Sequence, residues 1–263
     1  MLDQTKKIGD ILRHWRRVRG MSQMDLAIDA GISTKHLSFV ENGKSHPSRE
    51  LILKLAHVFD LSLRDRNAFL LASGFSPEFS EMPLQTDQMC IIHDTLQRIL
   101  IAHEPYPALV VDATYNILMT NQTFDEIITR YAGSNALEKY SNIYRLMFSE
   151  DGMRPWIRNW PTIKNILLAR LWGEAVSSQD ENLLKIHKEL DYHLPAEKKY
   201  SHFPESNLPI LDLTLQKEAS TLRFFSTITT FGTPLDITVQ GIRIDCMFPA
   251  DDETKMAMKT WNN

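Results

Sequence analysis

The sequence predicts an all-α domain over residues 1–75, a linker over 76–86 and an α+β domain over 87–263. Three observations predict this division. Short helical stretches, punctuated by Ser and Gly, fill the first part. The Pro- and Ser-rich stretch SPEFSEMPLQT has no periodicity, and we interpret it as a linker or a partly docked connection. Residues 87–263 contain both helical stretches and stretches in which apolar residues alternate with polar ones. This combination is typical of an antiparallel sheet with helices on one side.

Five short helices are expected in the first domain. The apolar residues of the stretch over 8–19 fall on one helical face, and Gly20 ends that helix. Each of the next four helices follows a Ser that can accept a hydrogen bond from the first turn. These N-cap residues are Ser22, Ser33, Ser48 and Ser62. Gly31, Gly43 and Gly74 end three of the helices, where glycine tolerates a positive φ.

The second domain begins with a helix over about 87–103. The stretch ALVVDATYNILMTN predicts a hairpin, after which Asn121 can cap a helix. A long helical region follows over about 154–193. The last part predicts strands in LDLTLQ, TLRFFSTITTF and LDITVQGIRIDCMF, the last with an irregularity at Gly241, and a final helix in DETKMAMKTW. We therefore expect about five strands, antiparallel, in an α+β domain.

Charge is distributed unevenly between the two domains. Residues 1–75 contain 12 Lys and Arg against 8 Asp and Glu, whereas residues 76–263 contain 17 against 25. A basic first domain favours a polyanionic partner for that domain alone. No apolar stretch is long enough to cross a bilayer, the start does not resemble a secretory signal, and the two cysteines lack metal-ligand spacing. We expect a cytoplasmic protein that contacts no membrane and holds no metal.

The segment from Gln23 to Asn42 predicts a helix-turn-helix. Two helices meet at Gly31, and apolar residues have the spacing that holds the two helices together. In this arrangement the N-terminal end of the second helix enters the major groove of double-stranded DNA. The alternative is a helical hairpin that binds no partner or binds protein. The DNA-contact candidates are Gln23, Ser33, Thr34, Lys35, Ser38, Arg16, Arg17, Lys44 and Arg49.

These candidates divide into base and phosphate contacts. Lys35 can donate to guanine O6 or N7, and the methyl group of Thr34 can touch a thymine methyl. Gln23 begins the preceding helix, where its side chain or nearby backbone N–H groups can bind a phosphate. The four arginine and lysine candidates at the rim are expected phosphate partners.

Two longer stretches carry a family resemblance. Residues 8–75, with HLSFVENGKSHPSRELILKLAHVFDLSLRDRNAFLLASGF, resemble the phage-repressor-like helix-turn-helix (XRE) family, in the branch with an MmyB-like C-terminal domain. PYPALVVDATYNILMTNQTFDEI and NIYRLMFSEDGMRPWIRNWPTIKNILLARLW resemble that C-terminal domain, whereas the final strands match only a sub-branch. The resemblance implies a PAS-like domain that binds a fatty-acid-like or another small apolar ligand.

Bulky apolar residues of the second domain are candidates for lining a ligand pocket, and the alternative is that they form an ordinary core. The candidates are Met119, Phe124, Ile128, Met147, Trp160, Leu168, Leu171, Trp172 and Phe224. Arg223 and Arg243 lie in expected strands, where either can pair with a ligand carboxylate or face solvent.

No motif for catalysis is present, so we expect no enzyme and no cofactor. The favoured function is a sequence-specific transcriptional regulator that acts as a homodimer and responds to a small apolar ligand. One alternative is a constitutive regulator whose second domain only dimerises. Another is an enzyme domain with an autoregulatory DNA-binding head.

Overall fold

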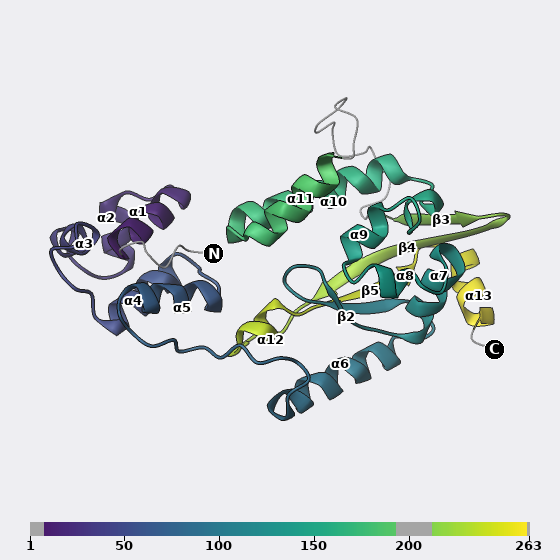
Figure 1. Ribbon diagram of the computed structural model, residues 1–263, viewed down its shortest axis with the longest axis horizontal. Helices are drawn as coiled ribbons and strands as arrows, with labels where there is room; N and C mark the ends of the chain where they lie inside the picture. Colours follow the sequence, from purple (N-terminus) through teal and green to yellow (C-terminus); the bar gives the residue numbers. More distant parts are fainter. Residues whose placement is uncertain (1–7, 193–211, 262–263) are drawn as a thin grey trace. The chain divides into compact units, whose positions relative to one another are not determined.

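The computed structural model describes residues 8–192 and 212–261 (Figure 1). Three stretches lie outside the described residues, namely 1–7, 193–211 and 262–263. The outer ends of the two expected domains and Leu211 of the expected strand LDLTLQ fall in these stretches. The chain divides into two compact units. The first contains the chain up to Met82 together with Thr233–Gln240, and the second contains Pro83–Gly232 and the chain from Gly241 onward. One stretch from the far end of the sequence thus belongs to the first unit.

The first unit contains the five expected helices. They are α1 (Ile8–Val18), α2 (Gln23–Asp29), α3 (Thr34–Glu41), α4 (Arg49–Val58) and α5 (Leu63–Ala72). All four serine N-caps are confirmed, because each side chain accepts a hydrogen bond from the backbone N–H three residues later. Gly20, Gly31, Gly43 and Gly74 all have positive φ.

The core of the first unit is built around Trp15, Phe59 and Phe69, which are fully buried. Gly9 places α3 against α1. A Cβ atom at Gly9 would lie 2.2 Å from the carbonyl oxygen of Glu41, so only glycine allows the two helices to approach this closely. The sequence offered no sign of this contact.

Residues 76–82 belong to the first unit and pack against α5 through Asn67. The side-chain oxygen of Asn67 accepts the N–H groups of Glu78 at 2.9 Å and Phe79 at 3.0 Å, and its amide nitrogen donates to the carbonyl of Phe79 at 2.7 Å. Of the two interpretations of 76–86, the docked connection describes this part of the stretch. The two units divide between Met82 and Pro83.

A short helix replaces one expected strand. We expected LDITVQ to be extended, because Leu235, Ile237 and Val239 alternate with polar residues. That expectation is wrong, since α12 (Ile237–Gly241) forms there instead. The cause is Asp236, whose Oδ1 accepts the N–H groups of Thr238 at 2.8 Å and Val239 at 3.3 Å and so starts a helical turn.

The second unit contains one five-stranded antiparallel sheet with the order β2-β1-β5-β4-β3. The sheet confirms the expected α+β class and the expected hairpin at the start of this region. Its strands are β1 (Ala108–Val111), β2 (Ile117–Thr120), β3 (Leu213–Lys217), β4 (Ser220–Thr229) and β5 (Arg243–Pro249). The order places β5, the last strand in the sequence, at the centre of the sheet.

Helices cover both faces of this sheet, and the expected one-sided cover is wrong. All four residues of β1 are buried, and both α6 (Cys90–Ala102) and α7 (Gln122–Ala132) pack against it. Successive side chains of a strand point to opposite faces, so complete burial needs cover on both sides. Asn121 caps α7, as expected, by accepting the N–H of Phe124 at 3.0 Å.

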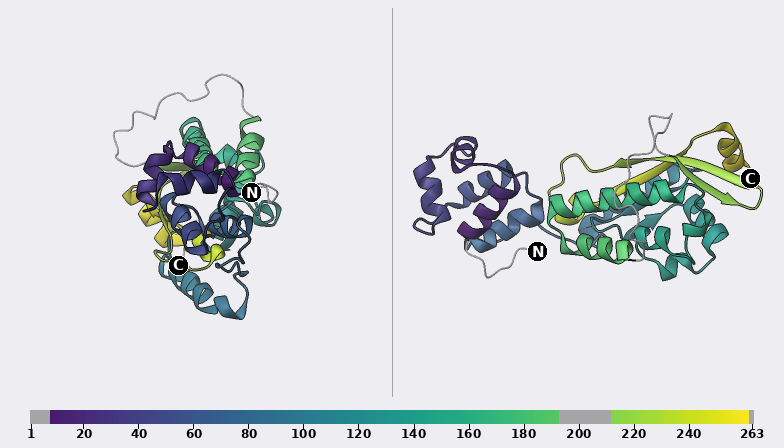
Figure 2. Two further views of the ribbon diagram at one scale, coloured as in Figure 1. Left: turned by 90° about the vertical axis from the view of Figure 1, so that its left-hand side faces the viewer. Right: turned by 90° about the horizontal axis from the view of Figure 1, so that it is seen from above.

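The remaining helices of the second unit are short, apart from two that lie side by side, α10 and α11 (Figures 1 and 2). They are η1 (Asp87–Met89), α8 (Ala136–Lys139), α9 (Ile143–Phe148), η2 (Arg154–Trp156), α10 (Trp160–Ser178), α11 (Glu181–Tyr192) and α13 (Asp252–Trp261). The final helix α13 is confirmed.

Candidate DNA-binding surface and ligand cavity

The first candidate site is the N-terminal end of α3. Gly31 turns the chain at φ +61°, and the hydroxyl of Ser33 accepts the N–H of His36 at 3.1 Å to start the helix. Ser33, Thr34 and Lys35 are all exposed, as is His36. The helix is held below by Leu37 and Val40, which are fully buried. The expected base-contacting residues therefore lie together on one solvent-facing helix end.

Two further side chains extend this surface. Phe39 is 40% exposed, and Lys35 Nζ lies 5.8 Å from the centre of its ring. A cation at that distance is attracted by the aromatic face. Ser38 is half-buried, and its Oγ accepts a hydrogen bond from Asn42 Nδ2 at 3.3 Å. The attraction of Lys35 to the Phe39 ring therefore favours a position of Lys35 at the exposed end of α3.

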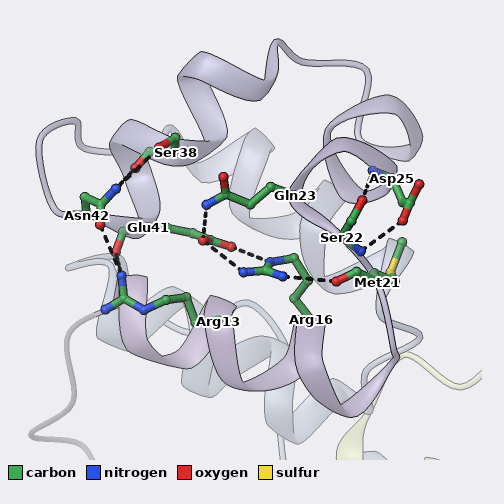
Figure 3. Close-up of polar contacts among 9 residues, drawn as sticks. All are labelled: Arg13, Arg16, Met21, Ser22, Gln23, Asp25, Ser38, Glu41 and Asn42. Carbon is green, nitrogen blue, oxygen red and sulfur yellow. Dashed lines mark hydrogen bonds and ion pairs between the residues drawn. The ribbon is translucent and has the colours of Figure 1, made fainter.

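A buried carboxylate organises the back of this surface (Figure 3). Glu41 is only 2% exposed. Its Oε1 lies 2.8 Å from Arg16 Nε, and its Oε2 accepts the side-chain N–H of Gln23 at 2.6 Å. Arg16 also donates to the carbonyl of Met21 at 3.0 Å, and Arg13 donates to the backbone carbonyl of Glu41 at 2.5 Å. Glu41 therefore ties α1, α2 and α3 together.

Three candidate DNA contacts have partners within the protein. Arg16 and the amide nitrogen of Gln23 bond to the buried Glu41, whereas Arg49 forms a separate, exposed pair with Glu78 at 2.8 Å. Arg17 and Lys44 lie exposed at the rim. Sequence reasoning missed Glu41, although an acidic residue on the same helical face as Leu37 was a signal of a buried partner.

The second candidate site is a cavity of about 330 Å³ in the second unit. It lies between the sheet, through β1, β3, β4 and β5, and the helices α9 and α10. Its lining is mostly apolar. The lining residues are Leu109, Val111, Tyr115, Ile143, Tyr144, Met147, Ile163, Ile166, Leu167, Arg170, Leu213, Phe224, Phe225, Ser226, Ile228, Arg243, Asp245 and Met247.

Two of the nine expected lining residues, Met147 and Phe224, line this cavity. Four others, Phe124, Ile128, Leu168 and Leu171, belong to the surrounding core, with Trp160 packed against it. Met119 lies in β2 opposite Val110. Trp172 is 42% exposed, with its ring 5.1 Å from that of His187. Apolar character alone did not separate cavity from core.

One end of the cavity carries a cluster of charged and polar groups around Glu174. The hydroxyl of Tyr115 donates to Glu174 Oε1 at 2.6 Å, and Arg170 Nε lies 3.3 Å from the same oxygen. Arg243 Nη2 lies 2.9 Å from Glu174 Oε2, and its guanidinium stands 4.8 Å from the centre of the Tyr115 ring. Burial, together with the hydrogen bond to Glu174, raises the pKa of Tyr115 to about 12. The phenol stays protonated and orders Glu174.

Asp245 projects from β5 into the same cavity. Burial raises the pKa of its carboxyl to about 6, against the opposing effects of a hydrogen bond with Ser226 and the charge of Arg170. Its Oδ1 is buried and has no hydrogen-bond partner among the described residues. The other strand arginine, Arg223, is outside the cavity and pairs with Asp212 at 2.9 Å. No pattern in the sequence predicted Asp245 or Arg170 at the cavity.

The described residues give no sign of two other kinds of site. Within 8–192 and 212–261, no group of three or more His, Cys, Asp and Glu residues is placed to hold a metal ion. No helix in the described part of the chain has the length and apolar character needed to cross a membrane.

Comparisons with known proteins match both parts of the chain. Residues 7–69 match the model of a helix-turn-helix domain, and residues 92–260 match that of the MmyB-like transcription regulator ligand binding domain. The second match covers more than half of the chain. The chain belongs to the MmyB-like transcription regulators.

Two similar proteins show the range of this likeness. An uncharacterised HTH-type transcriptional regulator from Archaeoglobus fulgidus is 37% identical over 54 residues, which cover 20% of this chain and 77% of that protein. A solved structure of an RNA-binding light-oxygen-voltage receptor aligns with 98% of this chain at 10% identity and a TM-score of 0.29. The chain spans 64% of that receptor's length.

Membership of the MmyB-like regulators assigns a function class to each of the two domains. This transcription regulator combines a helix-turn-helix for DNA with a ligand-binding domain that contains the cavity. Regulators of this kind are not normally enzymes.

Proposed function

We propose that this protein is a sequence-specific, DNA-binding transcriptional regulator whose affinity for its operator changes when a small apolar molecule occupies the cavity. The observation that carries the proposal is the course of the chain between β4 and β5. Both strands line the cavity, through Ile228 near the end of β4 and Arg243 at the start of β5. The segment that joins them, Thr233–Gln240, belongs to the compact unit that contains the helix-turn-helix.

The contacts of this segment fix it to the first unit. Asp236 Oδ2 accepts the hydroxyl of Ser80 at 2.7 Å and the N–H of Met82 at 3.2 Å. Gln240 Oε1 accepts the N–H of Leu63 at 2.8 Å, which is one of the N–H groups that the first turn of α5 leaves without a helical partner. Ile237 and Val239 are buried. A shift of β4 against β5 is therefore expected to act on α5 and on residues 80–82 through the bonds of Asp236 and Gln240.

The DNA side of the proposal rests on the exposed end of α3. Lys35 reads a guanine and Thr34 a thymine methyl, while Arg17 and Lys44 contact phosphates at the rim. One helix reads only a few base pairs, so we propose a homodimer that binds two half-sites roughly 34 Å apart. The ligand acts by a population shift between two dimer arrangements with different operator affinities. The protein works in the cytoplasm, with DNA as its macromolecular partner.

The experiment measures how a ligand alters operator binding. Selection from a random DNA pool supplies the operator, and its affinity is measured with and without decanol or decanoic acid. The unchanged protein should show an affinity change of about fivefold or more, the lower end of ordinary coupling between sites. Asp236→Ala, which removes the bonds to Ser80 and Met82, should retain operator binding and lose most of this change.

A matched variant distinguishes the route from general damage. Asp251 also begins a helix, accepting the N–H of Thr254 at 2.8 Å, but it lies outside Thr233–Gln240. Asp251→Ala should keep the ligand response. If Asp236→Ala responds as fully as the unchanged protein, the segment is not the route. If the unchanged protein binds its operator equally with and without either compound, the constitutive alternative replaces the ligand-responsive one.

A further inference from the structure

The polar end of the cavity has a charge balance that restricts what can bind there. Two cations, Arg170 and Arg243, flank Glu174, and the carboxyl of Asp245 lies on β5 in the same cavity. Arg170 and Arg243 supply two positive charges, and ionised Glu174 and Asp245 supply two negative ones. The cluster is therefore neutral when all four groups are ionised.

We propose that the cavity is built for an apolar chain with an uncharged hydroxyl head, whose O–H donates to Asp245. This inference rests on the proposed ligand-binding function and names the class of ligand. The buried Oδ1 of Asp245 lacks a partner among the described residues, and a carboxylate oxygen can only accept. A ligand hydroxyl supplies the missing donor, and the lone pairs of its oxygen remain available to a cavity cation such as Arg170.

Charged heads fit this cluster less well. A carboxylate head adds a second negative charge beside Asp245. Either one of the two carboxyl groups must then bind a proton, or one negative charge stays unbalanced in an apolar cavity. An ammonium head pairs with Asp245 but leaves an excess positive charge beside Arg170 and Arg243. An alkane leaves Oδ1 without a donor. The hydroxyl head is the one that satisfies the oxygen and leaves the charge balance unchanged.

The apolar part of the lining fits the rest of such a molecule. Apolar side chains line the cavity from both α10 and the sheet, namely Ile163, Ile166 and Leu167 from α10 and Phe224, Ile228 and Met247 from the strands. A volume of about 330 Å³ is at the small end of ligand sites, which matches a chain of medium length rather than a long-chain lipid.

The test is a panel of four ten-carbon compounds, namely decane, decanol, decanoic acid and decylamine. Binding to the full-length protein is measured at pH 7.5 by thermal shift and calorimetry. Decanol should bind about tenfold or more tightly than the other three, since an unmade hydrogen bond to a buried charged group has an effect of this size. If decanoic acid or decylamine binds as tightly as decanol, the inference is overturned while the ligand-binding function stands. If none of the four binds, the proposed cavity function itself fails.

A substitution at Asp245 sharpens the test. Asp245→Asn keeps the size and one accepting oxygen but removes the negative charge, so the cluster gains a net positive charge. Decanol should still bind within about threefold, and the affinity for decanoic acid should rise until it matches or exceeds that for decanol. Asp212→Asn is the control, because Asp212 pairs with Arg223 and does not line the cavity. An unchanged preference in Asp245→Asn would contradict the assignment of Asp245.

Discussion

The recognition helix and the ligand cavity are assembled in different ways. The exposed end of α3 is one continuous stretch, Ser33–His36, whose capping and turn are set by neighbouring residues. The cavity takes its lining from four strands, the helices α9 and α10 and the turn at Tyr115, over a span from Leu109 to Met247. Substitutions at the first site act on DNA binding almost alone, whereas those at the second also alter the packing of the sheet. The contrast predicts which measurement each substitution changes.

The largest expected effect is at the support of the recognition helix. Glu41→Ala removes the carboxylate that holds Arg16 and Gln23, and it leaves the partly buried guanidinium of Arg16 without its ionic partner. Breaking a buried pair in this way costs about 3–5 kcal/mol of unfolding free energy. Hydrogen exchange followed by mass spectrometry should show lost protection across α1, α2 and α3 and unchanged protection in β1 and β5.

The matched control for this substitution is Glu78→Ala. Glu78 also pairs with an arginine, Arg49, but both side chains are about two-fifths exposed. Such a pair contributes at most about 1 kcal/mol. Equal losses in Glu41→Ala and Glu78→Ala would mean that the Glu41 network does not hold the three helices together.

The second prediction distinguishes a base contact on α3 from a phosphate contact at the rim of the surface. Lys35→Ala removes an exposed cation from the expected base-contacting end and should weaken operator binding by about 1–3 kcal/mol, with relaxed preference at one base pair. Arg17→Ala is the control, since Arg17 lies at the rim. It should weaken all sequences alike and reduce the salt dependence of binding by about one charge. A uniform loss in Lys35→Ala would make Lys35 a phosphate contact.

Local patterns in the sequence were sufficient for the first unit. Ser and Gly at the helix ends, together with the apolar spacing around Leu37 and Val40, predicted five helices and the turn at Gly31, because capping and turn chemistry act within a few residues. The contacts of Gly9 and Glu41 were not predictable, since they depend on how α1 and α3 cross rather than on either helix.

The rest of the chain, after Met82, shows where local patterns fail. Alternation in LDITVQ is equally compatible with a strand and with one buried helical turn, and the capping carboxylate of Asp236 decided for the helix. Cavity-lining and core residues share the same apolar character, so Phe124 and Leu171 could not be distinguished from Met147 beforehand. Only the strand order, with β5 in the centre, brings Asp245 to the cavity.

The smallest expected effect is a pH dependence of stability that arises at Asp245. Its pKa in the folded protein is about 6, above the ordinary value of 3.8, so the folded state binds the proton more tightly than the unfolded state. This contribution to stability is fully present below about pH 4 and is lost as the pH rises through 6. The full shift in pKa corresponds to almost 3 kcal/mol, and screening at the partly accessible site reduces the expected loss of stability to about 1–2 kcal/mol.

Denaturant unfolding at pH 4.5 and 7.5 should therefore show that the stability advantage of the unchanged protein over Asp245→Asn shrinks as the pH rises. An advantage that grows with pH would mean that Arg170 lowers the pKa of Asp245 more than burial raises it, and the cavity would then hold a fully formed ion pair instead of an acceptor waiting for a ligand.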